Sequence, residues 1–235
     1  MPILELAKKK KLSISRVEEY YNALRTNIQL SGENIRVIAI SSTFPGEGKT
    51  TTSTNLALTF AKAGHKTLLV DADIRNSKML GGVFKSDGKV TGLTEYLSGT
   101  TDLSQGLCET DEPNLFVVSS GQTSPNPTAL LQSDRFATMM TVLRRHYDYI
   151  IVDTPPIGMV VDATLISRVC DASLLVVAPK EVKRKMVQKS KTQLEQSSTP
   201  FLGVVLNKYN VEADKYGFYG SYGYYGDQLK EESNK

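Results

Sequence analysis

The stretch IRVIAISSTFPGEGKT, residues 35–50, decides the fold of this chain. Residues 35–41 form a continuous apolar and β-branched run, with the length and composition of a strand buried on both faces of a parallel sheet. A loop rich in glycine follows, and we expect a helix from about Lys49 to Ala63, stopped by Gly64. The stretch therefore predicts a strand, a glycine loop and a helix in direct succession.

The loop TFPGEGKT, residues 43–50, carries a pattern that binds phosphate. It matches GxxxxGK(S/T) except that Thr43 replaces the first glycine. Glycines let backbone N–H groups turn inward around phosphate oxygens, and the following helix points its positive end at the same charge. Lys49 can reach the β- and γ-phosphates of a nucleotide, and the Thr50 hydroxyl is placed to bind Mg²⁺. A plain glycine turn would require neither side chain, so we predict a nucleotide site. Its expected cofactor-binding residues in the loop are Gly46, Glu47, Gly48, Lys49, Thr50 and Thr51.

Acidic residues end two other apolar runs of the chain. LLVDADIR brings Asp71 and Asp73, with Arg75 just beyond, and YIIVDTPP brings Asp153. The carboxyl ends of parallel strands meet at one edge of a sheet, which is where such folds bind ligands. Any one of these side chains could be an ordinary surface residue. Because both runs are expected to end beside the phosphate loop, we predict that they belong to the same site.

The rest of the chain alternates between strand and helix patterns. A first helix is expected at about 16–30, where Ser15 and Glu18 have capping-box spacing, and Ser133 is a candidate cap for a later helix. Further strands are expected at 66–71, 114–120, 149–153, 173–179 and 201–207, and further helices at 92–99, 133–147, 162–170 and 181–195. This alternation predicts an α/β fold, a P-loop NTPase-like doubly wound and mostly parallel sheet with helices on both faces.

Composition limits the class of protein. The 235 residues, 40% of them hydrophobic, fit one large α/β domain. We divide the chain into an N-terminal segment with a helix (1–34), the P-loop domain (35–209) and a flexible tail (210–235). The net charge of +3 is mild, whereas a protein that binds duplex nucleic acid would show a denser basic stripe, so no nucleic-acid partner is expected.

Cysteine, histidine and apolar patterning exclude other classes. Cys108 and Cys170 lie far apart without a CxxC motif, and the chain has two histidines, so neither a disulfide framework nor a thiolate or histidine metal site is expected. No apolar run approaches the roughly 20 residues that span a bilayer. The first residues, MPILELAKKKK, place their charges after their apolar residues, the reverse of a secretory signal. We therefore expect a cytoplasmic protein.

The motifs together resemble one family. PGEGKT, DxDxR and VDTPP occur in the order found in the bacterial tyrosine kinases (BY-kinases) of polysaccharide assembly. With EYYNALRTN ahead of the first buried strand and a tyrosine-rich tail behind the last, the resemblance covers nearly the whole chain. The deviant Walker ATPases of chromosome partition and division-site selection share the acidic second strand. They carry lysine at the second position of the loop, where this chain has Phe44.

The resemblance implies an ATP- and Mg²⁺-dependent protein-tyrosine kinase, and it implies roles for the catalytic residues Lys49, Asp71, Asp73 and Arg75. Lys49 would hold the phosphates together with the loop amides. Thr50 would bind Mg²⁺ directly, with Asp73 and Asp153 holding it through water. Asp71 would accept the phenolic proton or orient the hydroxyl, and Arg75 would contact the acceptor or the γ-phosphate.

The base of the nucleotide also has an expected contact. Asn207, in VVLNK, ends the last expected strand, where related ATPases contact adenine. The guanine-specifying pattern NKxD is not met, because Asn210 stands where the aspartate would be. ATP is therefore the expected nucleotide.

The segment KYGFYGSYGYYGDQ, residues 215–228, raises the question of how a chain uses tyrosines that it cannot bury. Glycine at every third position opposes both helix and strand, so the segment can scarcely belong to a core. The resemblance implies that the tail is the substrate, phosphorylated by a neighbouring subunit and made anionic by it. An adhesive low-complexity tail is the plainer alternative. The expected autophosphorylation sites are Tyr216, Tyr219, Tyr222, Tyr224 and Tyr225.

The helix EYYNALRTN corresponds to a family oligomerisation motif, Glu-x-x-Arg-x-x-Arg, that closes subunits into a ring. Glu19 and Arg25 match, but Asn22 stands where the first arginine is expected. The alternative is an ordinary solvated amphipathic helix.

The resemblance further implies partners. They are a membrane-bound activator, which recruits the kinase to the inner face of the cell membrane, and a counteracting protein-tyrosine phosphatase. The system would regulate the synthesis and chain length of capsular polysaccharide. A partition-type ATPase that switches on a surface is the alternative function. It would require lysine at position 44, where this chain has phenylalanine.

Overall fold

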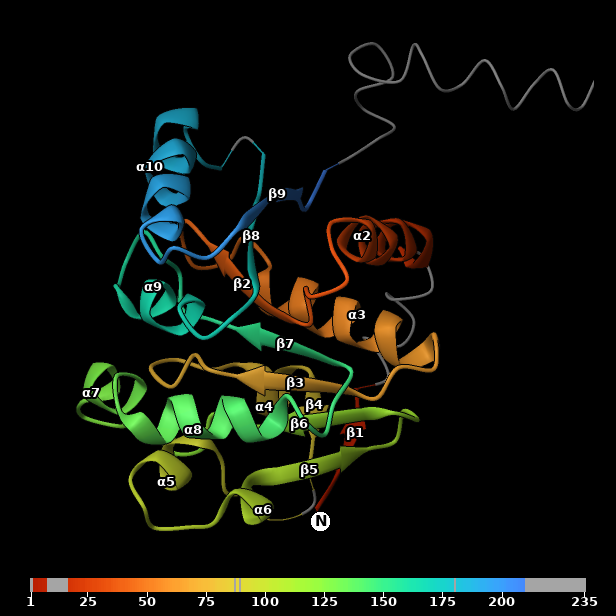
Figure 1. Cartoon of the computed structure of the whole chain (residues 1–235), viewed down its shortest axis with the longest axis vertical. Coiled ribbons are helices and arrows are strands. Elements are labelled where there is room, and N and C mark those ends of the chain that lie inside the picture. The colour runs from red at the N-terminus through yellow and green to blue at the C-terminus, as the bar shows by residue number, and fades with distance from the viewer. Residues whose placement is uncertain (1, 8–16, 87, 89, 180, 210–235) are drawn as a thin grey trace, which may run out of the picture.

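A computed structural model describes residues 2–7, 17–86, 88, 90–179 and 181–209 (Figure 1). Within these residues the strands form a nine-stranded sheet in the order β4-β1-β5-β6-β3-β7-β2-β8-β9. Strands β6, β3, β7, β2, β8 and β9 run parallel, and antiparallel pairs join β5 to β6 and β1 to β4. The sheet is mostly parallel and carries the strand–helix alternation expected of a P-loop NTPase-like fold.

The bounds of the elements follow. The strands are β1 (Ile3–Leu6), β2 (Val37–Ser42), β3 (Thr67–Asp71), β4 (Phe84–Lys85), β5 (Leu107–Thr110), β6 (Leu115–Val118), β7 (Tyr149–Asp153), β8 (Ala172–Val177) and β9 (Phe201–Leu206). The helices are α2 (Glu18–Leu30), α3 (Lys49–Lys62), α4 (Met79–Gly82), α5 (Leu93–Leu97), α6 (Leu103–Gly106), α7 (Pro127–Leu131), α8 (Asp134–Leu143), α9 (Asp162–Ser167) and α10 (Arg184–Glu195).

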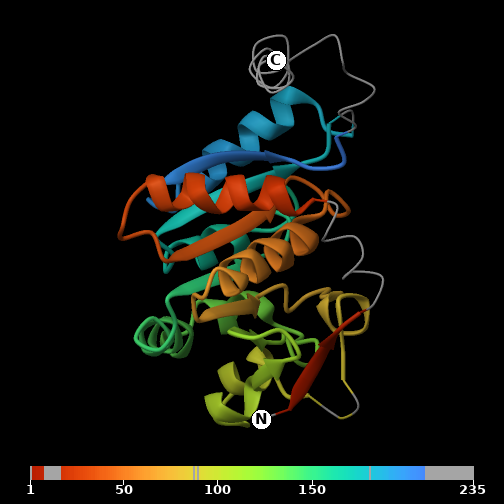
Figure 2. The same cartoon turned by 90° about the vertical axis from the view of Figure 1, so that its right-hand side faces the viewer.

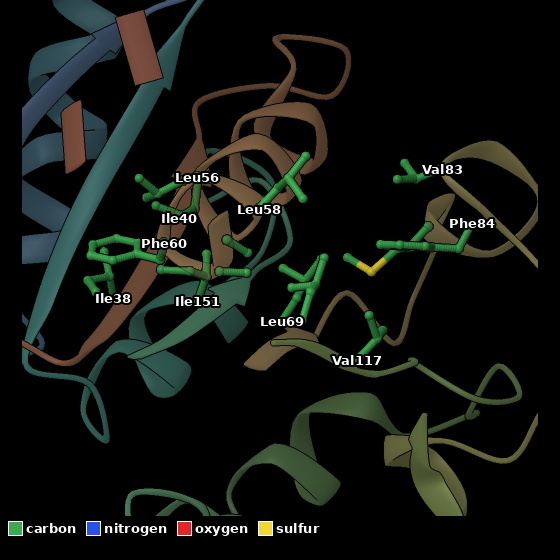
Figure 3. Close-up of a cluster of buried hydrophobic side chains, with 14 of the residues drawn as sticks. Ile38, Ile40, Leu56, Leu58, Phe60, Leu69, Val83, Phe84, Val117 and Ile151 are labelled. Atoms are coloured by element: carbon green, nitrogen blue, oxygen red, sulfur yellow. The ribbon is translucent and has the colours of Figure 1, made fainter. Parts of the chain in front are cut away.

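Strand β2 is buried throughout because helices cover both faces of the sheet. Ile38 and Ile40 point into a core shared with Leu56 and Phe60 of α3 (Figure 3). Val37 and Ala39 alternate with them and point into a second core, which α5, α8 and α9 cover. Figure 2 shows α2 lying beside α3 on the first face. The prediction of helices on both faces is confirmed.

The helix ends agree with the capping residues expected from the sequence in one case and differ from them in another. Helix α3 ends where predicted, and Gly64 follows it with φ +89°, a left-handed conformation that suits glycine. Ser133 occupies the N-cap position of α8, but its hydroxyl donates a hydrogen bond to the carbonyl of Leu130 instead of capping the helix. Helix α2 begins at Glu18. The Ser15 partner of the expected capping box lies outside the described residues.

The N-terminal segment contributes to the sheet. Strand β1 pairs parallel with β5 and antiparallel with β4, so residues 3–6 join the domain that was expected to begin at residue 35. The division of the chain at residues 34 and 209 stays a prediction. In the part of the chain that the structure describes, no helix is long and apolar enough to cross a membrane.

Candidate active site

The phosphate loop between β2 and α3 has the backbone that its glycines predict. Gly46 and Gly48 both adopt left-handed conformations, with φ of +88° and +97°. A Cβ atom on Gly48 would lie 1.9 Å from the Nδ2 atom of Asn207, so any larger residue would displace that amide. The loop therefore requires glycine at position 48 for both its backbone angle and its close approach to the end of β9.

Glu47 has a role in the loop that its sequence position did not suggest. Its side chain is buried, and the carboxylate accepts hydrogen bonds from the backbone N–H of Phe44 (2.6 Å) and of Ala178 (3.2 Å). The carboxylate therefore closes the loop on itself and ties it to the residue after β8. The prediction that Glu47 binds the cofactor remains possible only through its backbone, because its side chain is committed to these contacts.

Asn207 also holds the loop. Its Nδ2 atom donates a hydrogen bond to the carbonyl of Glu47 at 2.8 Å, and its backbone N–H donates to the carbonyl of Val177. The end of β9 thus lies directly against the phosphate loop. The expected adenine contact of Asn207 stays a prediction, and the side-chain Oδ1 atom is the acceptor left for it.

The two acidic strand ends meet at Lys49. The Lys49 ammonium lies 2.8 Å from the Asp73 carboxylate and 3.9 Å from the carboxylate of Asp153. Thr50 donates a hydrogen bond to Asp153 at 2.6 Å, and Ser53, one helical turn after Lys49, donates to its other oxygen at 3.0 Å. The structure therefore brings together the predicted metal-binding residues, and it adds Ser53, which the i, i+4 spacing on α3 could have revealed.

Burial and neighbouring charges shift the pKa values of Asp153 and Lys49 in this cluster. Burial raises the pKa of the Asp153 carboxyl, while Lys49 and the hydrogen bonds from Thr50 and Ser53 act in the opposite direction. Burial would lower the pKa of Lys49, but attraction to Asp153 and Asp73 outweighs it and raises that pKa. The ammonium is thus held charged between two carboxylates.

Asp71 has a different environment, although it ends the neighbouring strand. It is fully buried, and it accepts a hydrogen bond from the Ser77 hydroxyl, while its Oδ1 atom has no hydrogen-bond partner in the described chain. Burial, together with repulsion from Asp153, raises the pKa of Asp71 to about 7. Lys49 and Asp73 line the cavity over the phosphate loop, and Asp71 is not among its lining residues.

Arg75 is held by two helices. Its Nε atom lies 2.6 Å from the buried carboxylate of Asp162, and its Nη2 atom donates to the Thr128 hydroxyl at 2.7 Å. Thr128 in turn donates to Asp162 at 2.9 Å. These contacts fasten the segment after β3 to α7 and α9. These contacts could not be predicted from the sequence, because Thr128 and Asp162 lie 53 and 87 positions from Arg75.

A cavity of about 420 Å³ opens over the phosphate loop. Its lining includes the polar residues Lys49, Thr50 and Asp73 and the apolar residues Pro155, Pro156 and Met159. The volume falls within the range of small-molecule sites. The cavity therefore places an anion-binding loop, a cation and carboxylates around one open space.

The residues present suit Mg²⁺. Hydroxyl and carboxylate oxygens are its preferred protein ligands, and Thr50 and Asp153 supply both within hydrogen-bond distance of each other. Within the described residues, no group of three or more histidine, cysteine or acidic side chains forms a ready-made metal centre. This pattern fits an ion that takes few protein ligands and keeps its remaining positions for phosphate oxygens and water.

The remaining predicted residues lie on α2 or beyond the described chain. Glu19 is exposed on α2, and Arg25 is partly buried with an Nε atom that has no hydrogen-bond partner among the described residues. Their role in oligomerisation stays a prediction. The five tail tyrosines lie outside the described residues.

Comparisons with known proteins agree with this geometry. A family model described as an AAA domain matches residues 35–194. The tyrosine-protein kinase CpsD of Streptococcus pneumoniae is 62% identical over 226 residues, which cover 96% of this chain and 99% of that protein. The kinase domain of the Escherichia coli tyrosine kinase ETK is 32% identical with a TM-score of 0.76, covering 82% of this chain and 77% of that one. The cell division ATPase MinD of Pyrococcus furiosus is 28% identical with a TM-score of 0.62, covering 74% and 73%.

Proposed function

The chain belongs to the bacterial tyrosine-protein kinases, and we propose that it is an autokinase that phosphorylates the tail tyrosines of a neighbouring copy. The observation that supports this most is the convergence of Lys49, Thr50, Asp73 and Asp153 on one cavity above a glycine loop. Phosphoryl transfer asks mainly for positioning and for compensation of charge, and these residues supply both.

Lys49 is proposed to exchange partners during the reaction. Without nucleotide it compensates Asp73 and Asp153. When ATP binds, the phosphates compete for the ammonium, and the N–H groups of the loop and of the start of α3 surround their oxygens. The carboxylates then become available to the metal ion. Mg²⁺ bound together with ATP would therefore offset part of the negative charge that the nucleotide brings into the cavity.

Thr50 would hold Mg²⁺ directly, and Asp73 and Asp153 would hold its water ligands. The ion would neutralise charge on the β- and γ-phosphate oxygens. Ser53 supports this arrangement because it fixes the second oxygen of Asp153 and leaves the first directed at Thr50. The pair Thr50 and Ser53 thus orients Asp153 from one face of α3.

Asp71 is proposed to accept the phenolic proton or to orient the hydroxyl. A phenol has a pKa near 10, so a carboxylate with a pKa of about 7 is a closer match than an ordinary aspartate. Asp71 is buried, and its Oδ1 atom has no hydrogen-bond partner in the described chain, so the phenol would bind that oxygen while the Ser77 hydroxyl stays on the other. Arg75 would contact the acceptor or the γ-phosphate only after release from Asp162, so we assign it the weaker role.

The wider system is proposed from the family. A membrane-bound activator would recruit the kinase to the inner face of the membrane, and a protein-tyrosine phosphatase would reverse the modification. Glu19 and Arg25 of α2 would join copies into a ring, with Asn22 replacing one charged contact. Phosphorylation of the tail would regulate the synthesis and chain length of a capsular polysaccharide.

Phosphopeptide mapping tests the proposal. The purified chain is incubated with Mg²⁺ and ATP beside a Lys49→Met variant, and peptide mass spectrometry locates the phosphate. We expect phosphate on tyrosines between residues 216 and 225 in the parent and none in the variant. Release of free phosphate with an unmodified tail would contradict the proposal and favour the partition-type ATPase, which the likeness to MinD keeps as the second candidate. If the isolated chain shows no tyrosine phosphorylation, the cytoplasmic segment of the activator is added. If phosphorylation is still absent, the proposal is contradicted.

A further inference from the structure

A basic face lies on α10, which packs at the β8–β9 edge of the sheet (Figure 1). We define it by four exposed side chains within seven residues: Lys183, Arg184, Lys185 and Lys189. None of the four forms an ion pair with another residue of the described chain. Lys185 and Lys189 are four residues apart on the helix, a spacing at which like charges repel each other. No ion pair within the described chain therefore compensates this concentration of positive charge.

Other cations of the molecule contrast with the basic face. Lys62 pairs with Glu18 at 2.8 Å, and Arg144 pairs with Asp171 at 2.7 Å. Even on α10, Lys191 lies 3.5 Å from Glu195 in the last turn. Unpaired cations are thus concentrated at the beginning of the helix. An anion from outside the described residues would offset their mutual repulsion.

The described chain leaves the sheet next to this face. Strand β9 runs parallel to β8, so it ends at the same edge of the sheet at which α10 begins. The Lys208 ammonium forms an ion pair with Glu181 at 3.0 Å, only two residues before Lys183. Residue 210 therefore follows a segment that is fastened beside the first turn of α10.

Charge and reach make residues 210–235 a suitable occupant. Their side chains comprise five carboxylates and three lysines, a net charge of −2. Each phosphotyrosine adds about −1.5 to −2 charges, and Lys and Arg are the usual partners of phosphate. Seven residues lead from Tyr209 to Tyr216 and span at most about 25 Å, whereas the 12 residues of α10 extend about 18 Å.

We propose that the basic face of α10 binds the phosphorylated form of residues 210–235 of the same chain. The inference rests on the proposed function, because that function supplies the phosphates. The tether raises the local concentration of the tail to the millimolar range, so a modest affinity suffices. A tail held in this way lies on the kinase domain and no longer competes for the nucleotide cavity. The modified kinase thereby retains its own product.

A binding experiment with synthetic peptides tests the proposal. The peptide is residues 210–235 with a fluorescent label, made either with phosphate on the five tyrosines or without it. Fluorescence anisotropy measures its binding to the full chain carrying Lys49→Met, which prevents modification during the assay. We expect the phosphorylated peptide to bind at least ten-fold more tightly than the plain one, with an affinity that falls as salt rises.

Matched charge reversals locate the site. Lys185→Glu with Lys189→Glu should weaken binding of the phosphorylated peptide at least ten-fold, whereas Arg145→Glu with Arg168→Glu changes the net charge equally at exposed positions elsewhere and should leave it unchanged. Position 185 lies in the first turn of α10, where glutamate favours the helix, and position 189 is exposed, so loss of structure is not expected from the first pair.

Three outcomes would overturn the proposal. The first is equal affinity for the two peptides, and the second is an equal loss of affinity for the phosphorylated peptide in both double variants. The third is a Lys185/Lys189 variant that no longer binds phosphatidylserine vesicles but still binds the phosphorylated peptide. The last would assign the face to an anionic membrane. Because the phosphates are introduced by synthesis, these results do not depend on whether the kinase modifies its own tail, which the mass spectrometry decides separately.

Discussion

Asp153 and Asp71 end neighbouring strands, and the contrast between their surroundings separates two kinds of buried carboxylate. The residues pair in register at the ends of β7 and β3, and both are buried. Asp153 has Lys49, Thr50 and Ser53 around it, and each of its oxygens accepts a hydrogen bond. In the described chain, Asp71 accepts a hydrogen bond from Ser77, and its other oxygen has no hydrogen-bond partner. Lys49, Thr50 and Ser53 oppose the rise that burial causes in the pKa of Asp153, whereas Ser77 is the hydroxyl that opposes it at Asp71, whose pKa is raised to about 7.

Removal of Lys49 should have the largest effect, because Lys49 compensates the charge of Asp73 and Asp153 in the free protein and would bind the phosphates of ATP. We expect Lys49→Met to lower tyrosine phosphorylation by about 10³-fold, since the phosphates lose their main cationic partner. Without nucleotide, Asp73 and Asp153 lose their buried counter-ion, so unfolding should become easier by about 3 kcal/mol. Phosphotransfer assays and chemical denaturation measure the two effects.

A second substitution separates the two consequences of losing Lys49. Lys49→Met combined with Asp153→Asn should recover much of the stability and none of the activity. If the double variant is no more stable than Lys49→Met alone, the charge-compensation argument is wrong.

Asp153→Asn should lower the rate by between about 10² and 10³, because the amide is a poorer acceptor for the water ligands of Mg²⁺ and for Thr50. The apparent affinity for Mg²⁺ should fall with the rate, and raising the Mg²⁺ concentration should restore part of it. A rate loss that is independent of Mg²⁺ would show that Asp153 does not act on the metal.

Asp71→Asn should lower the rate by about 10²-fold while ATP binding is preserved, since Asp71 is not among the residues that line the cavity. In the parent, the rate should rise with pH through about 7, because a carboxyl must lose its proton before it can accept one. In the variant this rise should disappear. A parent profile that is flat between pH 6 and 8, at saturating ATP and Mg²⁺, would remove Asp71 from the proton transfer.

Ser77→Ala should have the smallest effect and the most specific one. The Ser77 hydrogen bond lowers the pKa of Asp71, so its removal should raise that pKa and move the acidic limb of the rate profile upward by about one pH unit. Ser53→Ala is the matched control, because it removes the same kind of hydroxyl from Asp153 and should leave the limb in place. Ser77→Thr should restore the parent profile. Identical profiles for the two alanine variants would contradict the distinction between the carboxylates.

The sequence was informative wherever the required residue type is local. Strand β2, the loop and α3 follow from an apolar run, glycines at 46 and 48, and a helix stopped by Gly64. The parallel central strands were predictable because their burial on both faces leaves continuous apolar runs. Strands β1, β4 and β5 were not predicted, because two to four residues give too short a pattern to distinguish from loop.

The amino-acid sequence by itself determined the central strands and the helices that follow them, the family that the chain resembles and the side chains of the phosphate loop. Strand ends and glycine loops depend on neighbours along the chain, so their signals are contained in it. The tertiary structure alone decided the partners of the buried carboxylates. The Glu47 carboxylate closes the loop, and Asp162 holds Arg75. Among the described residues, Asp71 has a hydroxyl and no cation as its hydrogen-bond partner. Burial and distance fix the charge of these groups, and both arise only when residues far apart in the chain are packed together.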